Sequence, residues 1–206
     1  MGYRQLARAS RAAGAPLSDH RLGTFRYLAV VPPLLDLSLA DWVVLGVVGE
    51  GPTHGWPIVR LLRSDGELGR MWTVPRPIVY RSLATLTDRG LLEESGTTVE
   101  SRGPKRTIVR VTRSGRSALN RWLDTPVEHV RDVRTELLVK LALLDRAGRS
   151  PRALVEKQIA HLEPVIRAVS TPSDGAPFDA VLARWRREQA LAVDRFLRSL
   201  LESPTP

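Results

Sequence analysis

The sequence contains no cysteine among its 206 residues. A chain without thiols has no disulfide, no thiolate nucleophile and no zinc site built on cysteine. Histidine is scarce as well, with four scattered residues, none of which forms an i, i+4 pair beside a carboxylate as a metal site would require. We therefore predict no bound metal and no cofactor.

Motifs for catalysis are also missing. The chain has no GxSxG, no P-loop and no GxGxxG followed by an acidic residue at the right distance. A nucleophile paired with a base is the minimum that most catalytic sites need, and the sequence shows no such pair. We predict that the protein is not an enzyme.

Long apolar runs are absent too. No stretch approaches the roughly 18 residues that cross a bilayer. The basic first residues, Arg4, Arg8 and Arg11, are not followed by the apolar core and cleavage site of a secretory signal peptide, whereas this arginine-rich, acid-poor leader also fits a transit peptide. We predict no membrane contact and a location in the cytoplasm.

Positive charge is what the sequence has in excess. Lys and Arg number 31 against 22 Asp and Glu, which gives a formal net charge of +9. Such an excess favours an anionic partner, of which nucleic acid is the usual one. An arginine-rich coding background explains the same excess, so charge alone leaves both explanations open.

The chain divides into three parts by composition and periodicity. Residues 1–37 are rich in Ala, Gly, Arg and Pro with weak periodicity, and are predicted to be a flexible basic extension. Residues 38–124 show the order helix, helix, helix, β-hairpin, helix. Residues 125–206 are helical, and we expect them to form a dimerisation domain.

Local signals mark the elements of the middle part. Ser38 is a predicted N-cap of the first helix, and Thr53 of the second. Pro77 suits the first turn of the third helix, and Gly90 fits the left-handed residue that ends it. Residues 91–98 and 106–112 are predicted to form a two-stranded β-hairpin. Thr112 is the predicted N-cap of the next helix, which ends at Pro126.

The third helix has two faces. Val79, Leu83 and Leu86 follow the i, i+4, i+7 spacing of a buried stripe. Arg81 and Thr85 lie on the opposite face, which fits either a solvated surface or contact with DNA bases and phosphates. Tyr80 is predicted either to contact a phosphate with its hydroxyl or to pack its ring on the first helix.

The predicted fold is mainly α with a small β-hairpin wing: an N-terminal winged helix-turn-helix followed by the C-terminal helices. The hairpin tip is basic, and fits a wing on DNA phosphates or an ordinary charged turn. The predicted DNA-binding residues are Arg76, Tyr80, Arg81, Ser82, Thr85, Arg102, Lys105 and Arg106.

The last helix carries apolar residues at alternating spacings of four and three, which is a heptad-like seam. We predict that this seam forms a dimer interface, in which the polar Gln189 fixes the register. The predicted interface residues are Phe178, Leu182, Trp185, Gln189 and Phe196.

Four stretches together resemble the PadR family of bacterial transcriptional regulators. They are "LSLADWVVLGVVGEGPTHGW", "RMWTVPRPIVYRSLATLTDRGLL", "RGPKRTIVRVTRSGRSALNRWL" and "RDVRTELLVKLALL". The resemblance runs from about Leu37 to Leu144, and the helical tail to about Leu200 is similar to the longer, virulence-activator-like type. The 37 residues before it are not part of the family's pattern.

The resemblance implies a homodimeric repressor that binds double-stranded operator DNA with its winged helix. In many members a small, often phenolic molecule modulates that binding, so a small aromatic effector is a candidate partner. Trp122 lies where related regulators form an aromatic effector pocket, although packing in the core or an interface explains it as well. The alternative to a regulator is a winged-helix protein-interaction module that does not bind DNA.

Overall fold

A computed structural model describes residues 35–98, 106–169 and 177–202 of the chain. Of the predicted N-terminal extension, residues 1–34 lie outside the described residues. Arg102 and Lys105, which are predicted at the wing tip, also lie outside them. The remaining predictions can be compared with the structure.

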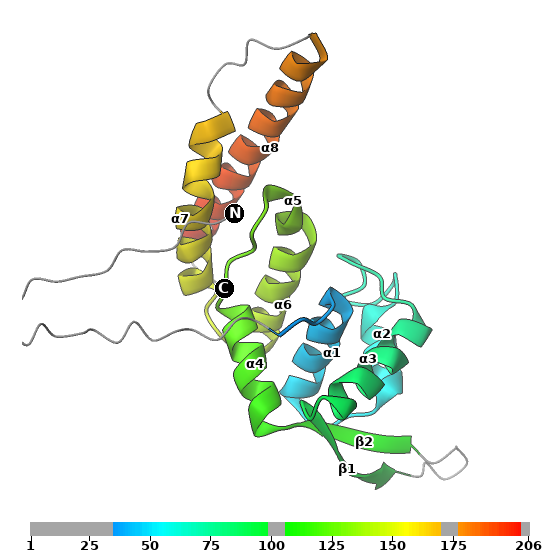
Figure 1. The fold of residues 1–206 in the computed structure, drawn as a ribbon. Helices are drawn as coiled ribbons and strands as arrows, with labels where there is room; N and C mark the ends of the chain where they lie inside the picture. Colours follow the sequence, from blue (N-terminus) through cyan, green and yellow to red (C-terminus); the bar gives the residue numbers. More distant parts are fainter. Residues whose placement is uncertain (1–34, 99–105, 170–176, 203–206) are drawn as a thin grey trace, which may run out of the picture. The chain divides into compact units, whose positions relative to one another are not determined.

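Three helices and a hairpin follow one another in the first half of the described chain. They are α1 (Leu39–Glu50), α2 (Gly55–Leu62), α3 (Arg76–Asp88), β1 (Leu92–Thr98) and β2 (Arg106–Val111), with α4 (Arg113–Leu123) after the hairpin. The strands pair antiparallel, and Figure 1 shows the hairpin beside α3. The predicted fold class, mainly helical with a small β-hairpin wing, is confirmed.

Local capping explains several of these boundaries. Ser38 caps α1 in a capping box with Asp41. Gly90 has φ +66°, and the N–H of Leu91 donates to the carbonyl of Leu86 at 2.9 Å, which closes the end of α3. The Thr112 hydroxyl accepts from the N–H of Gly115 at 3.0 Å and so starts α4. Each of these signals was readable in the sequence.

One boundary prediction is corrected. His54, not Thr53, caps α2: its Nδ1 accepts from the N–H of Trp56 at 3.4 Å. Thr53 instead pairs with β2, exchanging backbone hydrogen bonds of 3.0 and 2.8 Å with Val109. Arg76, which precedes Pro77, is the first residue of α3, because Pro75 takes the extended N-cap position.

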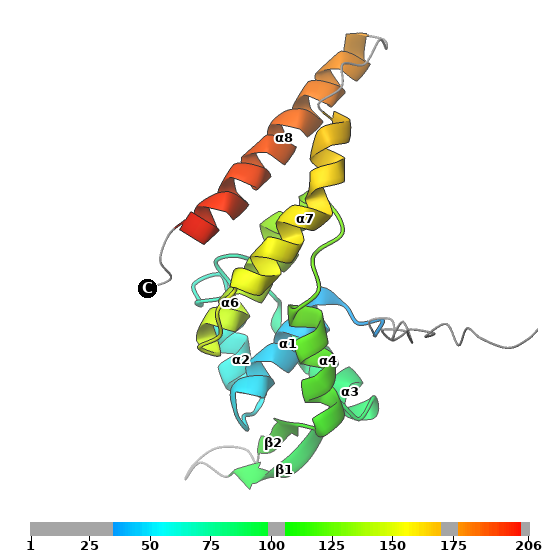
Figure 2. The same cartoon turned by 90° about the vertical axis from the view of Figure 1, so that its left-hand side faces the viewer.

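The C-terminal part is helical as predicted, but residues 127–144 do not form one regular helix. They contain α5 (Val130–Asp132), a single π-helical turn η1 (Val133–Leu137) and the start of α6 (Leu138–Arg146). Two long helices follow, α7 (Arg152–Val169) and α8 (Pro177–Glu202). They contact each other and run side by side in opposite directions (Figures 1 and 2).

Charged side chains join α6 to the first helices. The Arg146 guanidinium donates to Glu50 at the end of α1 and to Glu67 in the α2–α3 connection, each at 2.6 Å. These hydrogen bonds raise the pKa of Arg146 above its ordinary value. The C-terminal helices are therefore tied to α1 by polar contacts as well as by the apolar core.

Gln158 of α7 holds the connection between α4 and α5 in place. Its side chain is fully buried, with Oε1 accepting from the N–H of Val127 at 2.7 Å. Its Nε2 donates to the carbonyl of the same residue at 3.0 Å. One side-chain amide thus satisfies both backbone groups of a buried residue.

Replacing Gln158 with methionine would keep the side-chain length but remove both hydrogen bonds. Each buried backbone group left without a partner costs about 1–3 kcal/mol, so we expect the free energy of unfolding to fall by about 2–4 kcal/mol. Urea denaturation measures this difference. The neighbouring Lys157 is exposed, and Lys157→Met should change the free energy by less than about 0.5 kcal/mol. Equal urea midpoints for the two variants would contradict this role of Gln158.

Candidate nucleic-acid interface

A groove of about 550 Å³ lies between the start of α2, the outer side of α3 and strand β2. Arg76, Tyr80 and Ala84 of α3 form one wall, and Arg106 and Thr107 of β2 form another. His54 and Trp56, at the start of α2, close one end. The short turn at Gly90 brings the hairpin beside α3 and so creates the groove.

Tyr80 is the aromatic residue at the centre of this groove. Its side chain is 43% exposed, and the Arg76 guanidinium lies over its ring, 5.5 Å from the centroid. The ring packs on Gly55, where an added Cβ would lie 2.6 Å from Tyr80 Cε1. Tyr80 therefore rests on the start of α2, not on the first helix as the packing alternative supposed. Its position is fixed by a glycine, while its other side stays open to solvent.

The predicted contacts on α3 fall into three groups. Arg76, Tyr80 and Arg81 are exposed, but only the first two line the groove. Thr85 is half-buried and lies outside the groove lining. Ser82 is 1% exposed, because α3 packs this side against α1. The prediction that Ser82 contacts DNA is corrected: its hydroxyl is inside the protein.

The buried stripe of α3 also differs from the expected one. Val79 and Leu86 are buried, as predicted, whereas Leu83 is half-buried and lines the groove. Ser82 takes the inner position instead. The buried face is therefore rotated slightly toward Ser82, and the exposed face is centred on Ala84 rather than on Thr85.

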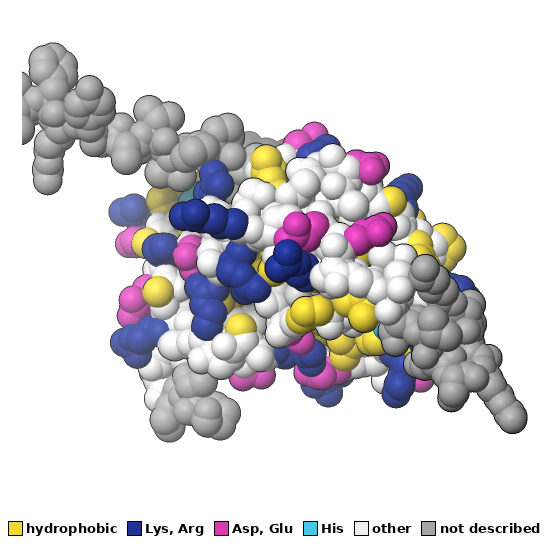
Figure 3. Space-filling model, turned by 90° about the horizontal axis from the view of Figure 1, so that it is seen from below, with side chains coloured by type: hydrophobic (Ala, Val, Ile, Leu, Met, Phe, Trp, Pro, Cys, Tyr) yellow, Lys and Arg dark blue, Asp and Glu magenta, His cyan; other side chains and the backbone are white. Residues whose placement is uncertain are grey.

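Positive charge is spread over the hairpin end of the molecule. Figure 3 views this end from below and shows several Lys and Arg side chains with acidic ones among them. Asp88 and Glu94 line the same groove as Arg76 and Arg106. The acidic groups disfavour phosphates close to them, so the electrostatics of the groove favour an anion on the arginine and tyrosine side.

Two residues of the groove were missed by sequence reasoning. Trp56 is 41% exposed and also borders a second groove with Arg60 and Arg63. His54 caps α2 and lines the same end of the groove. The position of both follows from the first turn of α2, where side chains project past the end of the helix, and apolar periodicity does not report this.

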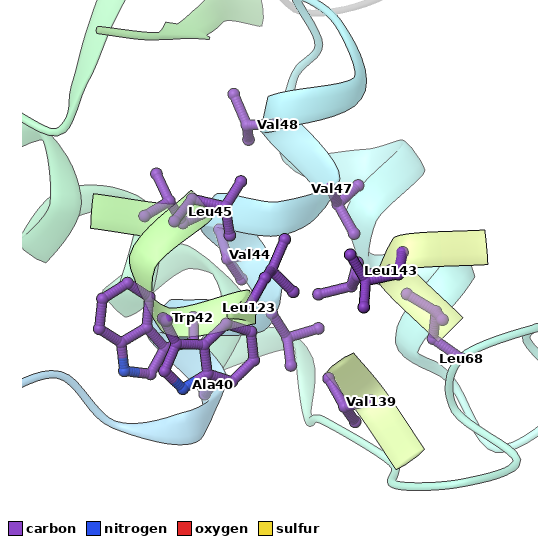
Figure 4. Packing of buried hydrophobic residues seen from close by; sticks show 14 of the residues in the cluster. Ala40, Trp42, Val44, Leu45, Val47, Val48, Leu68, Leu123, Val139 and Leu143 are labelled. Carbon is purple, nitrogen blue, oxygen red and sulfur yellow. The ribbon is translucent and has the colours of Figure 1, made fainter. Parts of the chain in front are cut away.

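Trp122 lies in the core. It is 2% exposed and stacks on Trp42 of α1, with ring centroids 5.2 Å apart and planes 1° from parallel. Figure 4 shows Trp42 among the buried side chains of α1, with Leu123 close by. The ammonium of Lys140 lies over the Trp122 ring, 4.8 Å from its centroid. Both ring faces are thus covered, which corrects the expected effector contact at Trp122 to a core position.

A buried ion pair completes the surroundings of Trp122. The indole N–H donates to Glu136 at 3.1 Å, and Lys140 Nζ lies 2.8 Å from the same carboxylate oxygen. Lys140 also donates to the carbonyl of Thr125 at 2.8 Å. Burial lowers the pKa of Lys140, and the hydrogen bond to Glu136 offsets part of that effect. Glu136 belongs to the π-helical turn, which orients it toward α4.

The seam residues of α8 differ in exposure. Phe178, Trp185, Gln189 and Phe196 are exposed, whereas Leu182 is half-buried. A different face of the same helix, with Ala190 and Leu197, is buried. Most seam residues therefore lie beside the contact between α7 and α8 and remain exposed next to it.

Searches of the described residues for other kinds of site give two further findings. No group of three or more His, Asp or Glu in this part of the chain could hold a metal ion. No helix within it is long and apolar enough to cross a membrane.

Three helices, a two-stranded wing and an uncovered groove between them define a winged helix-turn-helix, a DNA-binding fold. Residues 44–121 match the Transcriptional regulator PadR-like family. This stretch is therefore a PadR-like domain, which confirms the predicted resemblance over these residues and marks the chain as a transcriptional regulator. The longer type of C-terminal part stays a prediction.

Several solved structures are similar to the chain. Bacillus subtilis PadR in complex with operator DNA is 21% identical, with a TM-score of 0.41, over 78% of this chain and 97% of that one. The protein smu.1604c from Streptococcus mutans UA159 is 18% identical, with a TM-score of 0.39, over 79% and 98%. Bacillus subtilis PadR in complex with p-coumaric acid is 19% identical, with a TM-score of 0.34, over 79% and 93%. No curated protein matches the chain.

Replacing Trp122 with phenylalanine tests its place in the core. The change removes part of the stack on Trp42 and leaves the carboxylate of Glu136 with one donor fewer. We expect the free energy of unfolding to fall by about 2–3 kcal/mol. Trp56→Phe, the same change at an exposed position, should alter it by less than about 0.5 kcal/mol. Thermal and urea unfolding measure both, and equal effects would argue against the buried network.

Proposed function

We propose that the protein is a homodimeric transcriptional repressor that binds a double-stranded DNA operator through α3 and the wing. The observation that carries the proposal is the uncovered groove in which Arg76, Tyr80 and Arg106 converge from two elements. A DNA strand has its phosphates where the recognition helix and the wing meet, so these groups are phosphate contacts. They position the protein and carry no sequence information.

The exposed face of α3 reads the bases. Ala84 is small and lies at the centre of that face, which allows the helix to approach the floor of the major groove closely. Arg81 is exposed and lies outside the groove lining, so it can donate to a guanine edge. Thr85 contributes to base contacts only at the edge of this exposed face, because its side chain is half-buried. Arg102 and Lys105 extend the phosphate contacts beyond the described strands.

Two copies bind together. A dimer places two recognition helices at half-sites roughly 34–36 Å apart, one helical turn of DNA. The exposed seam of α8 supplies the dimer interface. A small molecule then modulates operator binding by favouring one of two arrangements of the α3 helices. Residues 38–124 act as the DNA-binding domain and 125–206 as the dimerisation domain in this proposal, and the protein works in the cytoplasm without catalysis.

The alternative, a winged-helix module that binds proteins and not DNA, differs in its dependence on salt. Arg76, Arg102, Lys105 and Arg106 give eight basic phosphate contacts per dimer, so we expect log K to fall with log[salt] with a slope of about −7. Fluorescence anisotropy with a duplex selected from random sequences measures this slope between about 50 and 200 mM salt. No binding at the lowest salt, or binding that does not weaken with salt, would favour the alternative.

The position of Tyr80 can be tested without changing Tyr80. In Gly55→Ala the new Cβ would lie 2.6 Å from the tyrosine ring, which must rotate away and lose its stack with Arg76. We expect operator affinity to fall about 5- to 10-fold, as for the loss of one good contact of about 1–1.4 kcal/mol. The fold should remain, because alanine is favourable in a helix.

Gly51→Ala is the matched control for this test. An added Cβ at Gly51 meets nothing within 4 Å, and its backbone is extended, with φ 168°. Its operator affinity should equal that of the unchanged protein. If Gly55→Ala binds the operator as tightly as Gly51→Ala does, the placement of Tyr80 is not part of DNA binding.

A further inference from the structure

A single arginine at the end of α6 contacts two separate parts of the winged helix. The Nε and Nη2 of Arg146 donate to the two carboxylate oxygens of Glu50, at 2.7 and 2.6 Å, and its Nη1 donates to Glu67 at 2.6 Å. Glu50 is the last residue of α1, and Glu67 lies in the connection between α2 and α3. A guanidinium that pairs with a carboxylate through two bonds fixes the direction of the contact as well as its length.

The connection between α2 and α3 is bound closely to the end of α2. The N–H groups of Leu68 and Gly69 both donate to the carbonyl of Leu61, at 3.1 and 3.0 Å. The N–H of Val74, just before α3, donates to the carbonyl of Leu62 at 2.9 Å. The end of α2, the connection and the start of α3 therefore behave as one unit, so a displacement of the connection displaces α3 as well.

Apolar side chains join the same elements. Leu68 of the connection is 2% exposed and belongs to the buried cluster that also contains Val139 and Leu143 of α6 (Figure 4). Leu143 also packs on α1, where a Cβ added at Gly46 would lie 2.6 Å from its Cδ1. Apolar packing sets how close these elements lie. Because it is not directional, it resists rotation less than a hydrogen-bonded ion pair does.

The position of α3 depends on the two elements that Arg146 contacts. α3 packs mainly on α1, α2 and β1, all of which belong to the winged helix. Its orientation relative to the C-terminal helices is therefore determined by how α1 and the α2–α3 connection are fixed to α6. Arg146 bonds to both, and only 20% of its side chain is exposed, so water competes with these bonds less than at an open surface.

We propose that Arg146 is a positioning residue that determines operator specificity. It fixes the angle of α3 relative to the C-terminal helices, and thereby the spacing between half-sites that a dimer accepts. The proposal rests on the homodimeric DNA binding of the proposed function and names the residue that sets its spacing. Arg146 acts through Glu50 and Glu67 and does not itself contact DNA.

The geometry of DNA makes operator choice sensitive to this angle. One inserted base pair moves the second half-site by about 3.4 Å along the duplex and rotates it by roughly 34–36°. A symmetric dimer divides this displacement between its two α3 helices. A dimer in which Arg146 holds α3 at one angle cannot follow the displacement, whereas a dimer without these bonds can turn α3 toward it.

The test is the affinity of the full-length protein for duplexes that differ in spacing. An operator selected from random sequences is lengthened or shortened by one base pair between its half-sites, and fluorescence anisotropy measures each dissociation constant. In the unchanged protein we expect the altered spacing to weaken binding by about 30-fold or more, because one half-site loses several base contacts. In Arg146→Met the same alteration should weaken binding by about 5-fold or less, because α3 can adjust.

Binding to the operator of selected spacing should change little in this variant. The side chains of α3 and the wing are all present, so we expect the affinity of Arg146→Met to stay within about 3-fold of that of the unchanged protein. A loss of folded protein would lower the affinity for every spacing equally. The ratio between spacings therefore separates a positioning role from a purely structural one.

Glu67→Gln tests the contact with the connection separately. Glu67 is exposed, so the substitution keeps the shape of the side chain and leaves the pair of Arg146 with Glu50 in place. We expect this variant alone to broaden the accepted spacing. The double variant of Arg146→Met and Glu67→Gln should accept altered spacing no more readily than Arg146→Met, because both changes break the same contact.

Arg152→Met is the matched control. Arg152 pairs with Glu156 at 2.9 Å within α7, at an exposed position, so this variant loses the same charge and also one ion pair. Its affinities for the three spacings should equal those of the unchanged protein. Circular dichroism and urea unfolding verify that all variants are folded under the conditions of the binding assay.

Three results would overturn the role of Arg146 and leave the proposed function intact. They are equal affinity of the unchanged protein for all spacings, unchanged discrimination in Arg146→Met, and equal broadening in Arg152→Met, which would make lost charge the cause. Absence of binding to any duplex by the unchanged protein is a different result. It would contradict the proposed function, and this inference with it.

Discussion

The burial of α1 is the constraint on which the rest of this structure depends. The helix is apolar on nearly all sides, and every residue from Trp42 to Val48 is buried. A helix of this kind must be surrounded, and α3, α4, β2 and α6 all pack on it. The recognition helix and the C-terminal helices therefore share one core, and α1 is its centre.

This shared core couples the two ends of the described chain. Val139 and Leu143 of the C-terminal helices lie near the α1 side chains (Figure 4). The Trp42–Trp122 stack, the Lys140–Glu136 pair and the ion pairs of Arg146 join the same elements by more specific contacts. Closely packed interiors do not deform smoothly, so a rearrangement of α6 has to repack α1, which also carries α3. The core of the described chain therefore connects the C-terminal helices to α3 through α1.

The groove between α3 and β2 and the apolar stripe of α8 (Phe178, Val181 and Trp185) expose opposite kinds of side chain. The groove between α3 and β2 exposes arginines and one tyrosine, whose polar tips suit phosphates. The α8 stripe exposes apolar side chains that suit only a dry interface. Under the proposed function, the first surface would bind DNA reversibly and with a dependence on salt, whereas an apolar surface such as the second is held to a partner by the hydrophobic effect.

The sequence by itself determined the order of helices and strands, the caps at Ser38 and Thr112, the stop at Gly90 and the family. These features depend on neighbouring residues, so local patterns reveal them. Tertiary structure alone decided that Ser82 turns inward, that Trp56 turns outward and that Thr53 pairs with β2. It also placed both faces of Trp122 in the core. Those outcomes depend on which segments meet in space, and a helical period fixes the buried face of a helix only to within about one residue, or 100°.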